Sequence, residues 1–144
     1  MENKSDKFKA QTGAKLIIDN DNIKEREIIF FDYTFKQPTD NLNQPSGIPR
    51  GGVINLTVKA LEDNADIFLW MISEESKKNG KIEVMVPGEN KKMKTIEFEE
   101  AFCINYNERW FTKDTSAAYP HTESFTLTCR KITNSGANYT SEWK

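Results

Sequence analysis

Apolar and polar residues alternate along much of this chain, which is the pattern of β-strands with one buried face. Ile54, Leu56 and Val58, for example, share one side of a run whose intervening residues are largely polar. Branched and aromatic residues, which suit a pleated surface, are frequent in such runs. The pattern predicts strands over 15–19, 27–37, 51–60, 81–86, 93–101, 102–111 and 123–133. The two runs within 93–111 can equally form one long bent strand.

The alternation also predicts which side chains share a face of each strand. One face of the second run comprises Ile29, Phe31, Tyr33 and Phe35. One face of the stretch 93–111, interrupted by Glu100, comprises Ile96, Phe98, Phe102, Ile104 and Tyr106. The expected buried face of the last run comprises Phe125, Leu127 and Cys129.

One helix is predicted over about 64–78, because apolar residues recur there at helical spacing. Asp63 is the expected N-cap, and Gly80 is the residue expected to stop the helix. The face expected to pack on the sheet comprises Ala65, Phe68, Leu69 and Ile72.

The same helix has more apolar surface than one sheet can cover. Ile67 and Met71 widen the apolar stripe, and Trp70 projects nearly opposite to it. A helix that is apolar all round is expected to be buried on every side. Two explanations stay open: another subunit covers Trp70, or a loop or the N-terminal arm of the same chain covers it.

Between the second and third predicted strands lies a long segment, 38–50, that does not read as a strand. It contains three prolines and Gly47. Proline fixes the backbone and removes a donor from the ladder of hydrogen bonds. Loops of this length inside a compact domain are usually functional or disordered. We therefore look for function there first.

The fold class that follows is mainly β: a small β-barrel of antiparallel strands with one α-helix and a long extended loop. The polar, lysine-rich residues 1–14 are predicted to form a flexible N-terminal arm, followed by a single domain over 15–144. Aromatic residues make up 11% of the chain, which suits either the core of such a barrel or the lining of a ligand cavity inside it.

Charge and hydropathy argue against two classes of partner. The chain carries 20 basic and 22 acidic residues, without the concentrated positive field that a nucleic acid backbone requires. The longest apolar run, 67–72, is far too short to cross a bilayer. The charged N-terminal residues are followed by no apolar stretch of a signal peptide. We expect a protein made in the cytoplasm, with no nucleic acid partner and no membrane insertion.

Candidate catalytic groups are few. His121 is the single histidine, and Cys103 and Cys129 form no metal-binding spacing. Both cysteines lie in predicted strands, which indicates buried structural thiols. A hydrolase that pairs Cys103 or Cys129 with His121 is the catalytic alternative. Our expectation is that the protein is not an enzyme and has neither a metal nor a cofactor.

Six stretches of the chain, in their order and spacing, resemble the Hcp/TssD tube proteins of bacterial type VI secretion systems. They are 44–58, 66–72, 77–82, 93–98, 101–108 and 125–132, and they begin with Gln-Pro-Ser-Gly-Ile-Pro-Arg-Gly-Gly. The resemblance implies a small β-barrel with one helix that assembles into hexameric rings. In this family the rings stack into a hollow tube, which a contractile sheath expels together with a spike, and some members carry effector proteins in the lumen.

The resemblance also implies roles for two segments. The loop 38–50 would contact the adjacent ring, through Leu42, Gln44, Pro45, Ile48 and Arg50. The helix would lie at the subunit interface or on the lumen, through Ile67, Trp70 and Met71. Implied partners are further copies of the chain, the sheath, baseplate and spike proteins, and effector cargo. The protein would leave the cytoplasm through the type VI apparatus without a signal peptide.

Two features are unusual for that family: the long N-terminal arm and the stretch 112–122. They leave a specialised paralogue, such as a cargo carrier or a cap, as an alternative to the bulk tube subunit. A subunit of a related contractile injection machine or phage tail, which shares the architecture, is a second alternative. A monomeric ligand-binding β-barrel with one large apolar cavity is the third.

Overall fold

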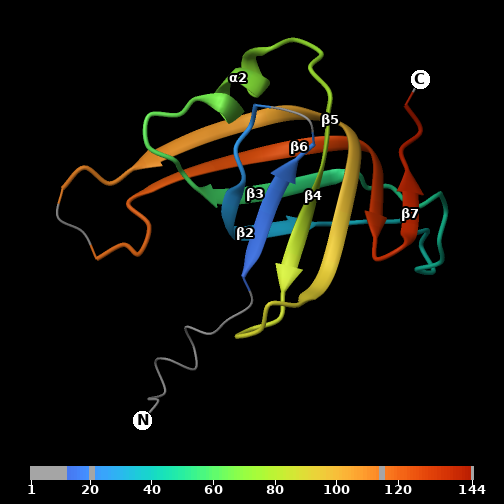
Figure 1. Ribbon diagram of the computed structural model, residues 1–144. Coiled ribbons are helices and arrows are strands. Elements are labelled where there is room, and N and C mark those ends of the chain that lie inside the picture. The colour runs from blue at the N-terminus through green and yellow to red at the C-terminus, as the bar shows by residue number, and fades with distance from the viewer. Residues whose placement is uncertain (1–12, 20–21, 114–115, 144) are drawn as a thin grey trace.

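A computed structural model describes residues 13–19, 22–113 and 116–143 of the chain, and these form seven strands and one helix (Figure 1). The elements are β1 (Ala14–Ile18), β2 (Arg26–Tyr33), β3 (Val53–Lys59), α2 (Asp66–Ile72), β4 (Lys78–Met85), β5 (Lys92–Trp110), β6 (His121–Asn134) and β7 (Ala137–Thr140). Most of the predicted arm 1–14 lies outside the described residues, although Ala14 already belongs to β1. The division into an arm and one domain stays a prediction.

The strands form a closed antiparallel barrel, which confirms the predicted fold class. Neighbours follow the order β3-β2-β1-β4-β5-β6-β7, and an additional pairing of β3 with β6 closes the barrel. The helix α2 lies against β5 at one side (Figure 1). Within the described residues, no helix has the length and the apolar content needed to span a bilayer.

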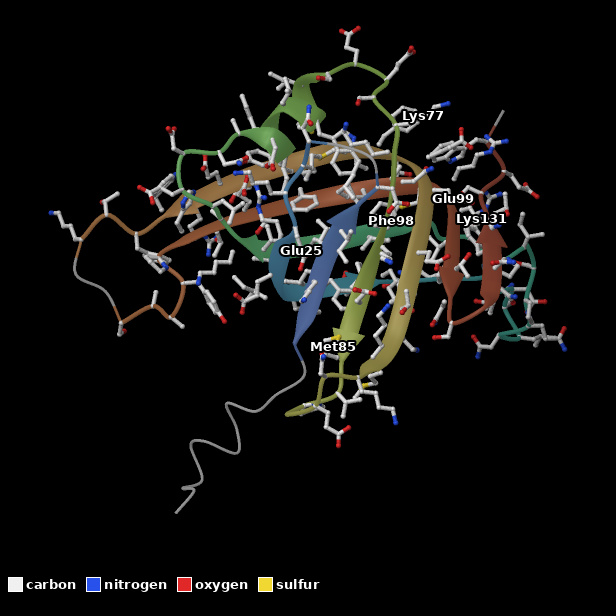
Figure 2. The ribbon with its side chains drawn as sticks, in the orientation of Figure 1. Glu25, Lys77, Met85, Phe98, Glu99 and Lys131 are labelled. Atoms are coloured by element: carbon white, nitrogen blue, oxygen red, sulfur yellow. The ribbon has the colours of Figure 1, made fainter. Side chains whose placement is uncertain are left out.

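The barrel interior is filled by side chains at alternating positions of the strands. The predicted faces of β3 and β6 are confirmed: Ile54, Leu56 and Val58 are buried, and so are the three corresponding residues of β6. Phe98 points into the core from β5, whereas its neighbour Glu99 lies outside and pairs with Lys131 across the strands (Figure 2). A ligand-binding barrel would need the space that these packed side chains occupy.

A β-bulge near the beginning of β2 changes which residues of the strand face the core. Ile28 is buried, and the register to β3 shifts between Ile28 and Phe30. Because a bulge inserts one residue into a strand, it moves the following side chains to the opposite face. Phe31 and Tyr33, which were predicted to share a face, therefore both pack against the core, whereas Phe30 is exposed.

The stretch 93–111 is one bent strand, and its predicted face is correct only in part. Glu100 adopts a left-handed conformation with φ of 49°, and the register between β4 and β5 shifts near it. The buried positions move there from Ile96 and Phe98 to Ala101 and Cys103. Phe102 and Ile104 were predicted to share a face with these buried residues, but Phe102 is partly exposed and Ile104 is exposed. Tyr106 packs against the core as expected.

The helix is shorter than predicted, and both of its predicted ends are wrong. It ends at Ile72, and the chain is extended at Ser73 and already pairs with β5 at Lys78. Gly80 does not stop the helix but lies inside β4, where a side chain would meet the Ile17 carbonyl oxygen at 2.6 Å. The N-cap position is Ala65 rather than Asp63.

The sequence analysis missed the last strand, β7. It follows β6 through a two-residue turn in which Ser135 and Gly136 both have positive φ, of 48° and 93°. Positive φ at both central residues is the requirement of the tight hairpin turn that matches the twist of its strands. The Ser-Gly dipeptide was the available signal for this hairpin.

Candidate assembly surfaces

The loop 38–50 joins β2 to β3 and is an extended hairpin rather than a disordered segment. Isolated bridges connect Lys36 with Arg50 and Thr39 with Pro45. All residues from 38 to 50 are exposed. An ordered hairpin with no cover of its own presents a defined shape to a partner at little cost in conformational entropy.

A turn at the tip of this loop holds Leu42 in solvent. One carboxylate oxygen of Asp40 accepts hydrogen bonds from the backbone N–H groups of Leu42, at 2.8 Å, and of Gln44, at 3.0 Å. Asn43 closes the turn in the left-handed conformation, with φ of 63°. The Leu42 side chain is 77% exposed, which is costly for a large apolar residue unless a partner covers it.

The base of the loop is fastened to β7. The backbone N–H of Gly51 donates a hydrogen bond to the Tyr139 hydroxyl at 3.1 Å, and the rings of Phe35 and Tyr139 lie 4.8 Å apart, edge to face. A side chain at Gly51 would meet the Phe35 ring at 2.2 Å, so only glycine allows this contact. The sequence analysis did not predict these contacts with Tyr139 because it did not predict β7.

The predicted stacking residues are all exposed on this one loop: Leu42, Gln44, Pro45, Ile48 and Arg50. Arg50 lies at the base, where it bridges to Lys36, and Leu42 lies at the tip. Their role in ring stacking stays a prediction.

The helix α2 packs with the opposite face to the one predicted. Ile67 and Trp70 are buried, and the Trp70 indole N–H donates a hydrogen bond to the Ser76 carbonyl at 2.9 Å. Trp70 is only 2% exposed, so its predicted projection away from the barrel is wrong. The residues expected to pack on the sheet, Phe68, Leu69 and Ile72, are exposed instead. The helix therefore does have apolar surface that the barrel does not cover, and this surface is made of Phe68, Leu69 and Ile72.

A buried ionic network fixes that orientation. The Arg26 guanidinium, fully buried, forms ion pairs with Asp66 at the start of α2 and with Glu123 of β6. The Tyr106 hydroxyl donates a hydrogen bond to Glu123 at 2.6 Å. Burial and this hydrogen bond raise the pKa of Tyr106 above its ordinary value. Because Asp66 is held in this way, Trp70, which follows four residues later on the same side of the helix, turns inward.

In addition to the short strand β7, which within the described residues pairs only with β6, two longer strands of the barrel have stretches with an open edge. Among the described strands, only β3 pairs with residues 30–33 of β2, and only β6 pairs with residues 102–110 of β5. These segments are the outer strands of a four-stranded portion in the order β2-β3-β6-β5. Open edges carry unpaired backbone groups that can join a second chain.

The cysteines and His121 do not come together. Cys103 and Cys129 are free and buried in β5 and β6, as predicted. His121 begins β6, where its Nε2 lies 2.7 Å from a carboxylate oxygen of Glu108. Because a strand rises about 3.3 Å per residue, His121 lies more than about 20 Å from Cys129 along β6. In the described part of the chain, no group of three His, Cys, Asp or Glu side chains could hold a metal ion.

The thiols are expected to react slowly in the folded protein. Burial raises the pKa of Cys103 to about 11 and that of Cys129 to about 12, so little reactive thiolate exists at pH 8. We expect labelling by dithionitrobenzoate to be at least ~100-fold slower than after unfolding in guanidinium. A thiol that reacts rapidly without unfolding would contradict the burial and revive the hydrolase alternative.

Comparison with known proteins points to one family. The family model described as Hemolysin coregulated protein Hcp (TssD) matches residues 10–144. The structure of Hcp1 from Flavobacterium johnsoniae is 26% identical, with a TM-score of 0.80 over 90% of this chain and 99% of that chain. No curated protein matches this chain.

Two further solved structures share the fold at lower identity. Hcp1 from Salmonella typhimurium is 10% identical, with a TM-score of 0.64 over 90% of this chain and 91% of that chain. The secreted protein Hcp3 from Pseudomonas aeruginosa is 13% identical, with a TM-score of 0.59 over 93% and 99%. At such identities the likeness extends to the barrel and its helix, whereas the surfaces must be argued from this chain's own residues.

Proposed function

Because the chain belongs to the Hcp (TssD) family of type VI secretion tube proteins, we propose that it is the structural subunit of the inner tube. Six copies form a ring, and the rings stack into a hollow tube that can carry effector proteins. The contractile sheath expels this tube from the cytoplasm, together with the spike, and the baseplate is a further partner.

The observation that carries this proposal is the pair of open edges on β2 and β5. Strand direction alternates across β2-β3-β6-β5, so the two outer strands run in opposite directions. When copies repeat in the same orientation, β5 of one copy therefore lies antiparallel to β2 of the next. A contact between two different edges of this kind is heterologous, and it closes into a ring when the rotation between copies fits.

Stacking is assigned to the loop 38–50. It projects beyond the barrel at the β7 end (Figure 1), and it is ordered and solvent-exposed along its whole length. The exposed apolar face of α2, made of Phe68, Leu69 and Ile72, is the second surface that assembly would cover. Ile67 and Trp70 support this face from the core rather than contact a neighbour themselves.

A charge on the β2 edge is expected to prevent ring formation. Phe30 is exposed on this edge, and Phe30→Lys places a charged group where a second strand would pair. We expect rings to form only at a protein concentration at least ~10-fold higher than for the unmodified chain, measured by sedimentation velocity.

Met93→Lys is the matched control for this variant. Met93 is 56% exposed, close to the 55% of Phe30, but it lies at the start of β5, outside both open edges. The control should assemble like the unmodified protein, and both variants should keep its circular dichroism spectrum. Equal assembly of the two variants would show that the β2 edge is not used.

A further inference from the structure

The end of the barrel opposite the loop carries a preformed aromatic cleft. It has a volume of about 490 Å³ and is lined by residues of the segment before and within α2 and by the ends of β5 and β6. Ala65, Phe68, Tyr106, Trp110 and His121 line it. Some of its residues also belong to the buried network or to the open edge of β5, but the cleft itself has no assigned role so far.

The cleft keeps its shape through contacts among its own rings. Trp110 stacks on His121 with ring centroids 3.2 Å apart, and His121 is held in turn by Glu108. The ring centroids of Phe68 and Tyr106 lie 5.7 Å apart, and the Tyr106 hydroxyl donates a hydrogen bond to the buried Glu123. Trp110 nevertheless remains 58% exposed. An exposed aromatic surface that is already ordered is typical of a site into which an apolar anchor inserts.

The loop and the cleft lie at opposite ends of one strand. β3 starts at Val53, just after the loop, and ends at Lys59, which pairs with Thr122 beside the cleft. Its seven residues span about 20 Å. Figure 1 shows the loop beside β7 on the right and the end of β5 with the start of β6 on the left. Copies stacked in the same orientation therefore bring the loop of one to the cleft of the next.

The chemistry of the two ends is complementary. The tip of the loop, from Asn41 to Ser46, carries no charge and presents Leu42 as its one large apolar side chain. The base of the loop carries the positive charges of Lys36 and Arg50, whose backbones form a β-bridge. The residues that line the cleft include two carboxylates, Asp63 and Glu108. Opposite charges on facing surfaces favour this orientation over the reversed one.

We propose that Leu42 of one copy inserts between the rings of Phe68, Tyr106 and Trp110 in the copy stacked on it. This inference rests on the proposed tube function and names the receiving surface of the stacking loop. The occupant is a second copy of this chain, and the contact is heterologous, so it propagates along an open tube. Glu108 and His121 act here as positioning residues, because they hold Trp110 in place.

Cysteine cross-linking tests the contact directly. Two single variants, Leu42→Cys and Ala65→Cys, are mixed, assembled and oxidised, and the native thiols do not interfere because both are buried. We expect a covalent dimer on a non-reducing gel. The double variant carries both partners on each copy and should give a ladder of longer products.

Ala137→Cys provides the matched control, since Ala137 is likewise exposed but lies on β7, beside the loop. Its mixture with Leu42→Cys should give no dimer. Stacked rings without the dimer between positions 42 and 65, or with an equal yield from position 137, would overturn the inference and leave the tube function intact. A protein that sediments as a monomer would overturn both.

A second variant separates stacking from ring formation. Phe68→Ala changes a cleft residue that lies outside both open strand edges, so it should leave the mass of isolated rings unchanged and raise the concentration needed for tubes at least ~10-fold, as seen by electron microscopy. Met93→Ala, at another exposed position, should leave both unchanged. Tubes that form equally well from both variants would contradict the assignment.

Discussion

Arg26→Ala is expected to lower the free energy of unfolding by about 3–5 kcal/mol, which is a large fraction of the stability of a typical domain. The guanidinium is fully buried and is the common partner of Asp66 and Glu123, so its loss leaves two carboxylates in the interior without a counter-charge. Urea denaturation followed by tryptophan fluorescence measures this change.

Two further variants make that result specific to the buried network. Arg130→Ala removes a partly exposed arginine that pairs with Glu100, and it should cost no more than about 1 kcal/mol. Arg26→Met combined with Glu123→Gln removes the buried arginine together with one of the two charges it balances, and it should recover part of the loss. Equal stability of Arg26→Ala and Arg130→Ala would show that the network does not hold the barrel.

Trp70→Ala is expected to cost about 3–5 kcal/mol in unfolding free energy, because it empties a core position and leaves the Ser76 carbonyl without its donor. Leu69→Ala, one residue away on the exposed face, should change stability by no more than about 0.5 kcal/mol. Thermal and urea unfolding of the two variants measure the difference.

These two variants also decide between the two orientations of the helix. If Leu69 and Ile72 packed on the barrel, as their spacing suggested, Leu69→Ala would be the destabilising change and Trp70→Ala the mild one. That reversed order would contradict the orientation described here. In the expected order, Leu69→Ala affects assembly only, because its side chain lies on the face left for a neighbouring copy.

The alternation of apolar and polar residues predicted the buried face well in strands whose alternate residues stay on the same face from end to end. Ile54, Leu56 and Val58 in β3 are buried as expected, and so is the matching series in β6. Alternation did not show which face is buried near Phe30 and beyond Glu100, where a bulge or a left-handed residue moves the side chains to the other face. Both shifts depend on pairing with a neighbouring strand, which a pattern within one segment does not contain.

The helix face could not be read from spacing because its first two turns are apolar on every side. Its orientation is set by Asp66, whose partner Arg26 is 40 residues away. A signal for the network did exist in the strands. Glu123 shares the parity of Phe125 and Leu127, which places a carboxylate on a buried face, and such a charge requires a partner. Arg26, on the parity of Ile28, is that partner.

Composition was sufficient to locate the loop but not the cleft. The prolines and length of 38–50 marked it as a candidate surface, and the structure adds the ordered tip at Leu42. The cleft joins residues near Ala65 with Trp110 and His121, and the last two meet because β5 and β6 pair as far as these residues. No local pattern relates these positions.

Self-assembly into rings is most directly tested by the mass of the unmodified protein in solution, measured by light scattering on a sizing column. The proposed hexameric ring predicts a species of six times 16.6 kDa, and stacking predicts larger species at multiples of that mass. A monomer of 16.6 kDa at high protein concentration would contradict the proposed tube function.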